Sequence, residues 1–126
     1  MPVACEAMDA SPFERTTWVL THLASAEGVL LPALPEARAT IEFADGRIGG
    51  SASCNRFTTT GPLTDIPDTI AITMMMCPEP IMEQEQRYLF LLPRIEDVRL
   101  VDDDLIAQDA NGADILVWRM EDGDDE

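Results

Sequence analysis

The sequence predicts an α+β fold: a mainly antiparallel, curved or partly barrel-like β-sheet with one principal helix, at about residues 80–92, packed on it. Three observations lead to this prediction. Segments that alternate between two faces, as strands do, occur before and after a single segment with helical spacing. Two residue pairs, Asp45-Gly46 and Asn111-Gly112, favour tight hairpin turns. Short links of this kind join antiparallel neighbours, and a lone helix then covers one face or end of the sheet.

Strands are predicted throughout the first half of the chain. Residues 16–23 and 38–43 alternate between two faces in the manner of strands. Residues 47–52 form the returning strand after Asp45-Gly46, and their glycines allow a bulge or a close backbone approach. A brief strand or an irregular loop is expected at 29–31, an extended segment at 63–67 and a further strand at 70–74.

The predicted helix has recognisable ends. Pro78 and Pro80 frame its start, where proline is tolerated because the first N–H groups of a helix have no partner inside it. Pro93 ends the helix, since proline disfavours the helical conformation of the residue before it. Three strands follow, at residues 98–101, 105–108 and 115–120, separated by turns at Asp102-Asp103-Asp104 and Asn111-Gly112.

The chain is long enough for one globular domain, since it has 126 residues and 46% of them are apolar. We expect a flexible N-terminal segment at residues 1–15, the folded domain at 16–120 and a solvated acidic tail at 121–126. No run approaches the roughly 20 apolar residues that a transmembrane helix requires. We also expect a monomer.

The charge of the chain restricts its partners. With 24 acidic and 8 basic residues, the net charge is −16, which repels phosphate backbones and anionic membrane surfaces. We therefore expect no nucleic-acid partner. A cationic partner or divalent ions remain open, although the acidic surface is more simply a source of solubility. Because the first residues lack the basic and apolar regions of a signal peptide, cytoplasmic localisation is expected if the chain is complete as given.

The three cysteines allow one pair with one cysteine left over. Cys54 lies in Ser53-Cys54-Asn55-Arg56-Phe57, and Cys77 ends the run Met74-Met75-Met76-Cys77, 23 positions later. A disulfide between them would stabilise the fold by roughly 3 kcal/mol. The alternative is a pair of buried, reduced cysteines that pack as small apolar groups. Cys5 is a spare thiol, or what remains of a lipid-attachment site after an export signal was trimmed.

Glu85 is unusual because it falls on the apolar face of the predicted helix, with Ile81, Tyr88, Leu89 and Leu92. A carboxylate in that position needs hydrogen-bond partners. We favour a structural acid that accepts backbone N–H groups from the turn around Cys54-Asn55 over a ligand-binding or proton-handling carboxylate.

The other polar candidates have local interpretations. Asn55 is expected to adopt a turn conformation or to bond the neighbouring backbone. Arg56 is expected to pair with the surrounding acidic residues, with anion binding as the alternative. The run Met74-Met75-Met76, together with Met82, is interpreted as adaptable core packing. A soft-metal site is disfavoured, because strand alternation places Met75 opposite its two neighbours.

The sequence contains no recognisable catalytic or metal-binding pattern. His22 is the only histidine, and nothing in the spacing brings it to a cysteine. Neither a C-x-x-C motif nor a histidine cluster suggests zinc. The run Asp102-Asp103-Asp104 lacks the alternating ligands of an EF-hand loop. We expect no cofactor, no bound metal and no enzymatic activity.

Five landmarks in this order resemble the META domain found in bacterial HslJ-like proteins. They are Trp18-Val19-Leu20, the hairpin Phe43–Gly50, Ser53–Phe57, Thr73–Cys77, and Glu85–Leu89 with Leu92. The resemblance spans about residues 16–120. Two departures are the serine at position 53, where glycine is usual, and the segment after Phe57, which lacks the usual G-x-Y pattern. The residues that match the family motifs are Trp18, Gly46, Asn55, Arg56, Phe57 and Glu85.

The resemblance implies a domain that is often exported or lipid-anchored, is associated with stress tolerance and has no assigned catalytic activity. We therefore expect a non-catalytic domain of the bacterial envelope or secreted fraction, which binds an unidentified protein or small molecule. Its location would be periplasmic, lipid-anchored or secreted if an export signal was trimmed. The alternative is a module for a small hydrophobic ligand or a lipid, with a pocket between sheet and helix lined by methionines and aromatic residues. An enzyme has the weakest support.

Overall fold

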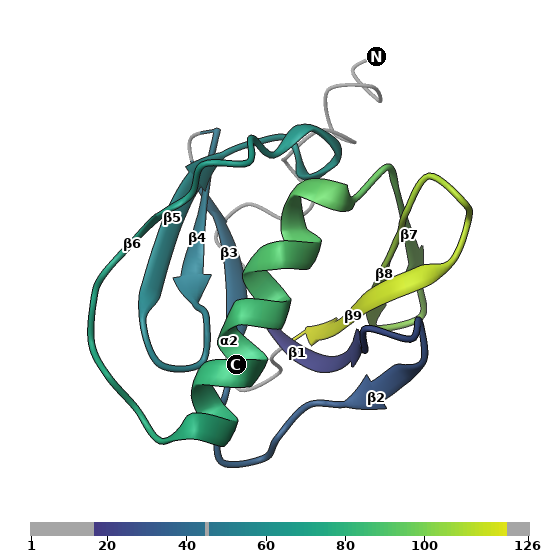
Figure 1. Ribbon diagram of the computed structural model, residues 1–126. Helices are drawn as coiled ribbons and strands as arrows, with labels where there is room; N and C mark the ends of the chain where they lie inside the picture. Colours follow the sequence, from purple (N-terminus) through teal and green to yellow (C-terminus); the bar gives the residue numbers. More distant parts are fainter. Residues whose placement is uncertain (1–16, 45, 121–126) are drawn as a thin grey trace.

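The computed structural model describes residues 17–44 and 46–120, and in this part of the chain nine strands form one antiparallel sheet that curves around a single α-helix (Figure 1). The helix is α2, Glu79–Leu91. The strands are β1 Thr17–Ala24, β2 Leu30–Pro32, β3 Thr40–Ala44, β4 Arg47–Ser51, β5 Arg56–Thr60, β6 Ala71–Ile72, β7 Asp97–Val101, β8 Asp104–Gln108 and β9 Asp114–Met120. The predicted α+β fold with a curved antiparallel sheet is confirmed.

The strands follow the order β6-β5-β4-β3-β1-β9-β8-β7, and β2 pairs with the far end of β1. The sheet is not closed. A 3₁₀ turn after β5, Leu63–Asp65, contacts β7 at the opposite edge and a second 3₁₀ turn, Leu92–Arg94, that follows the helix. The segment after β5 therefore extends across the opening, which makes the fold partly barrel-like.

The core lies between the concave face of the sheet and α2. Its largest fully buried side chains come from the strands and from the helix, and they include Trp18, Phe57, Tyr88, Leu92 and Trp118. Folding removes a large apolar area of each aromatic residue from contact with water, so these residues supply much of the favourable free energy of folding. The apolar face of α2 predicted from the sequence is correct in its centre, but Gln84 and Leu91 are more buried than Ile81 and Leu89.

The ends of the helix agree with the proline signals to within one residue. Pro78 is the N-cap residue and Pro80 lies in the first turn. The α-helix ends at Leu91, and Pro93 lies within the following 3₁₀ turn. Proline lacks the N–H that an α-helix needs and its ring clashes with the preceding helical turn, so the α-helix ends before it. A short 3₁₀ segment tolerates the proline.

Two predicted segments differ from the structure. The strand expected at 70–74 contains only Ala71–Ile72: the Thr73 N–H still donates to the Arg56 carbonyl of β5, but the Met75 N–H donates to the side chain of Asn55. The segment 63–67 is a 3₁₀ turn at Leu63–Asp65 rather than an extended chain.

Both predicted hairpins join antiparallel strands. Ala44 pairs with Arg47 across the first turn, where Gly46 has a φ of +79° that favours glycine; Asp45 lies outside the described residues. The second turn is longer than two residues, since the Asp109 side chain accepts the N–H groups of Asn111 and Ala113. The segments 1–15 and 121–126, expected to be flexible and solvated, also lie outside the described residues.

Candidate functional site

The structure contains a disulfide between Cys54 and Cys77, whose Cα atoms lie 6.1 Å apart. Cys54 belongs to the turn between β4 and β5, and Cys77 directly precedes the N-cap residue of α2. The sequence left open whether these cysteines are bonded or reduced. The covalent link fixes the start of the helix against the turn, which makes it a clasp between two elements far apart in the chain.

Glu85 is the polar centre of this clasp. It is 2% exposed, and its Oε1 accepts the backbone N–H groups of Cys54 at 2.9 Å and Asn55 at 2.7 Å. Its Oε2 accepts the side-chain amide of Asn55 at 2.8 Å. Both carboxylate oxygens are therefore engaged within the protein. This is the arrangement of a structural acid, and hydrogen bonds to a charged group of this kind are stronger than neutral ones.

Asn55 connects the clasp to the segment before the helix. Its Oδ1 accepts the Met75 backbone N–H at 2.6 Å and the Thr73 hydroxyl at 2.8 Å. Its side-chain amide also donates to the Met75 carbonyl at 3.2 Å. Asn55 thereby takes the place of a neighbouring strand for the backbone of Met75, and this explains why β6 does not continue.

The methionine run was wrongly interpreted as core packing. Met74 and Met76 are 86% and 87% exposed, and Met75 is also exposed. The physical reason is that Asn55 and the disulfide hold the backbone of this segment at the surface, beyond the edge of the sheet. These side chains consequently do not line a space between the sheet and the helix.

Gln84, beside Glu85 on α2, was missed from the sequence. Its Oε1 accepts the Leu34 backbone N–H at 2.8 Å, and its amide donates to the Ala37 carbonyl and the Ser53 hydroxyl, both at 2.9 Å. Two consecutive polar residues of one helix thus hold two separate loops. The available signal was a second polar residue adjoining the apolar face of the predicted helix.

Tyr88, one turn further along α2, is buried and has its hydroxyl fully used. The hydroxyl donates to the Thr40 carbonyl at 3.0 Å and accepts the indole N–H of Trp118 at 3.0 Å. Its ring packs edge-on against Phe57 and Trp118. Burial raises the pKa of the Tyr88 hydroxyl well above its ordinary value, and the Trp118 hydrogen bond lowers it by less. The group stays protonated and serves the fold.

The remaining predicted residues have structural or surface positions. Arg56 forms the expected ion pair, a long and exposed one with Glu42 at 3.9 Å. The ring of His22 contacts the Thr21 hydroxyl at 3.0 Å. Within residues 17–44 and 46–120, no three histidine, cysteine, aspartate or glutamate side chains are grouped to hold a metal ion. In the same part of the chain, every buried polar side-chain atom has a hydrogen-bond partner.

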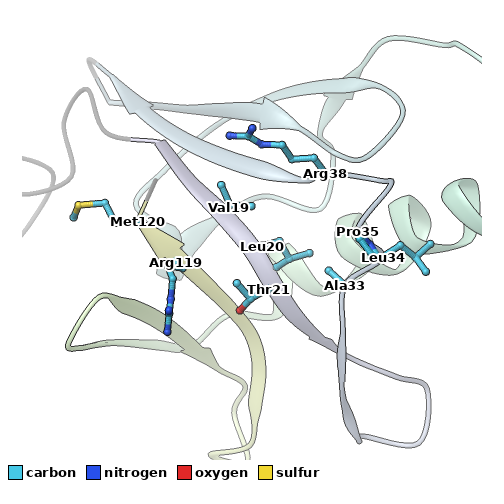
Figure 2. Close-up of a pocket in the computed structure, with 9 residues that line it drawn as sticks. All are labelled: Val19, Leu20, Thr21, Ala33, Leu34, Pro35, Arg38, Arg119 and Met120. Carbon is cyan, nitrogen blue, oxygen red and sulfur yellow. The ribbon is translucent and has the colours of Figure 1, made fainter. Parts of the chain in front are cut away.

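A groove on the outer face of the sheet, with its Leu34-Pro35 end beside α2, was also missed (Figure 2). Its volume is about 610 Å³, which lies within the range of small-molecule sites. Val19 and Thr21 of β1 form its floor, and Figure 2 shows Arg38 on one side and Arg119 on the other. The groove is also lined by Leu20, Ala33, Leu34, Pro35 and Met120. No single segment carries a signal for it, because its residues come from three separate parts of the chain.

The sequence profile of the META domain matches residues 11–122, which is most of the chain. This chain belongs to the META domain family. The expected family is therefore confirmed. A protein whose structure was determined by NMR shares 23% sequence identity with the chain and has a TM-score of 0.63; the match covers 87% of this chain and 92% of the other. At that identity the likeness concerns the fold alone.

No curated protein sequence matches the chain. Among the described residues of this META domain, no helix has the length and apolar character needed to cross a bilayer. The family motifs map to the fold as follows: Trp18 and Phe57 lie in the core, Gly46 in the first hairpin turn, Asn55 and Glu85 in the clasp, and Arg56 at the surface.

Proposed function

We propose that this META domain is a non-catalytic binding module of the bacterial envelope or secreted fraction, with a role in stress tolerance. The observation that supports it best is the state of the motif residues. Both oxygens of Glu85 accept hydrogen bonds within the chain, and both cysteines of the motifs are oxidised. A general base needs access to a substrate proton, and a nucleophilic cysteine needs a thiolate. The motif residues therefore suit a scaffold better than a reaction centre.

The same clasp supports the proposed compartment. Structural disulfides persist in the periplasm and outside the cell, whereas the cytosol keeps most thiols reduced. A disulfide between Cys54 and Cys77 therefore supports an oxidising location for the domain. The sequence contains one further cysteine, Cys5, for which the pairing leaves no partner within the chain.

Thiol counting tests this proposal. The unreduced chain is denatured and titrated with a thiol reagent, and one reactive thiol is expected. Three reactive thiols would show that the disulfide is absent, and the argument for an oxidising compartment would then fail. The non-catalytic role is tested separately by a screen for turnover, since activity that is lost in Glu85→Gln while the protein stays folded would contradict it.

A second candidate function is the binding of a small apolar ligand, and the groove of Figure 2 favours it. The pocket expected between sheet and helix is replaced by packed aromatic side chains, including Phe57, Tyr88 and Trp118. A ligand is therefore better placed on the outer face of the sheet. A ligand that binds only the folded state raises the melting temperature, and thermal shift measurements with small apolar compounds check this.

A further inference from the structure

The groove on the outer face of the sheet is lined by two arginines. The chain contains 24 acidic and 8 basic residues, yet two of the basic residues, Arg38 and Arg119, line this one groove, and no acidic residue does. An arginine guanidinium binds carboxylates and phosphates with paired N–H donors. The groove therefore offers two guanidinium groups to an anion on a strongly negative protein.

The sheet register places the two arginines on either side of β1. Val19 of β1 pairs with Thr40 of β3 on one side and with Arg119 of β9 on the other. Arg38 precedes β3 and lies two residues before Thr40, and the bridge of Ala39 to Ala52 continues the extended pairing toward it, so Arg38 falls on the same face as Thr40. Neighbouring strands lie about 4.8 Å apart and residues rise about 3.3 Å along a strand, so the two arginine backbones flank the floor of the groove about 12 Å apart.

Apart from the two arginines and Thr21, whose hydroxyl donates to the Val117 carbonyl at 3.1 Å, the side chains that line the groove are apolar. Ala33, Leu34, Pro35 and Met120 line it beside the floor residue Val19. The Leu34 backbone is fixed by Gln84 of α2. A ligand there would meet an apolar surface along its length and positive charge at its sides.

Both arginines already interact within the chain, and this affects how an anion would bind. Arg119 donates to Asp104 at 3.0 Å and 3.4 Å, and its side chain is still 62% exposed. The hydrogen bond to Asp104 is the larger cause that raises the pKa of Arg119, and the negative charge of Asp104 is the second. The guanidinium therefore remains positive. Arg38 is exposed and also has an interaction of its own. A guanidinium has more N–H donors than one carboxylate uses, so an incoming anion shares or displaces these contacts.

We propose that the groove binds a small amphiphilic anion, a molecule with an apolar chain or ring and a single carboxylate or phosphate group. Figure 2 shows the Arg38 and Arg119 side chains extending in different directions, so both must turn toward the floor of the groove to hold one anionic group between them, while the apolar part covers Val19 and Met120. This inference rests on the proposed binding function and names the ligand class for it. We do not expect polyanions such as nucleic acids to bind, because they extend beyond the groove and the negative charge of the rest of the molecule repels them.

Decanoate is the probe for the carboxylate arm, decyl phosphate for the phosphate arm, and 1-decanol is the neutral control. Binding to the full chain is measured by calorimetry, and shifts of backbone NMR signals locate the bound probe. Decanoate is expected to shift signals of β1 and β9. Because hydrogen bonds to charged groups are stronger than neutral ones, decanol is expected to bind about tenfold more weakly than decanoate. Tighter binding of decyl phosphate than of decanoate would identify phosphate as the preferred group.

Matched variants separate this site from general charge effects. Arg38→Gln and Arg119→Gln are each expected to weaken decanoate binding about tenfold. The control Arg99→Gln removes the same charge from β7, outside the groove, and is expected to leave the affinity nearly unchanged. Asp104→Asn removes the carboxylate that competes for Arg119 and is expected to tighten binding.

The results distinguish this inference from the function on which it rests. Equal binding of decanol and decanoate, or equal weakening by Arg99→Gln and Arg38→Gln, would overturn the anionic ligand while leaving an apolar-ligand module intact. No binding by any of the three probes would overturn both the amphiphilic anion and the small apolar ligand. The non-catalytic role would still be tested separately by the turnover screen.

Discussion

The structural role of Glu85 leads to a sharp prediction for Glu85→Gln. The glutamine amide oxygen can still accept the backbone N–H groups of Cys54 and Asn55, which now bond at 2.9 Å and 2.7 Å. Its amide nitrogen, however, would face the Asn55 side-chain amide that now donates to Oε2 at 2.8 Å. Two donors cannot bond each other, and Asn55 cannot simply turn over, because its oxygen accepts the Met75 N–H.

The size of the effect follows from these contacts. An unsatisfied buried donor costs about 1–3 kcal/mol, and the two surviving bonds lose the advantage of a charged acceptor. Glu85→Gln should therefore lower the free energy of unfolding by about 2–4 kcal/mol. For a domain of this size, about 1 kcal/mol corresponds to roughly 4 °C, so the melting temperature should fall by about 8–16 °C.

The assay is urea unfolding of the oxidised protein, with thermal unfolding as a second measurement. Glu83→Gln is the matched control, because Glu83 is exposed on the same helix and should change the free energy of unfolding by less than about 0.5 kcal/mol. If Glu85→Gln were as stable as Glu83→Gln, the carboxylate would not hold the turn, and a ligand-binding role for Glu85 would have to be reconsidered.

Three further predictions concern other parts of the fold. Tyr88→Phe removes both hydrogen bonds of the buried hydroxyl and should cost about 2–4 kcal/mol in denaturant unfolding. Because burial raises the pKa of Tyr88 in the folded state, the protein should lose stability as the pH rises above about 10, where the unfolded chain releases the proton, and Tyr88→Phe should reduce that loss. Replacing Cys54 and Cys77 together by alanine should lower stability by roughly 3 kcal/mol, and an equal melting temperature for oxidised and reduced wild-type protein would contradict it. Under dilute hydrogen peroxide, Met74 and Met76 should form sulfoxides before the half-buried methionine of α2, without unfolding; peptide mass spectrometry gives the order, and simultaneous oxidation would contradict their exposure.

The sequence was most informative where structure is set by local chemistry. Gly46 and Gly112 mark turns in which a positive φ favours glycine, and Pro78 and Pro80 mark the first turn of α2. The hydrogen-bonding partners expected for Glu85 were also correct, since a carboxylate on an apolar helix face must be satisfied and a turn with free N–H groups lay within the motif.

The sequence was least informative where an outcome depends on long-range contacts. The alternating pattern of residues 70–74 suits a strand, but Asn55, about 20 residues earlier, takes the hydrogen bonds of Met75, and the strand ends early. The methionines then become surface residues despite their apolar side chains. Burial is a property of the assembled fold, and no local pattern distinguishes a core methionine from one held outside by a clasp.

By itself, the sequence determined the family, the class of fold, the positions of the turns and the single helix, because each depends on neighbouring residues and their periodicity. Only the tertiary structure decided that Cys54 meets Cys77, that Gln84 and Glu85 hold two loops, and that Arg38 and Arg119 flank one groove. The physical reason is the register of the sheet. Two strands that are distant in the chain, β3 and β9, become neighbours of β1, and their side chains acquire a shared surface only through that pairing.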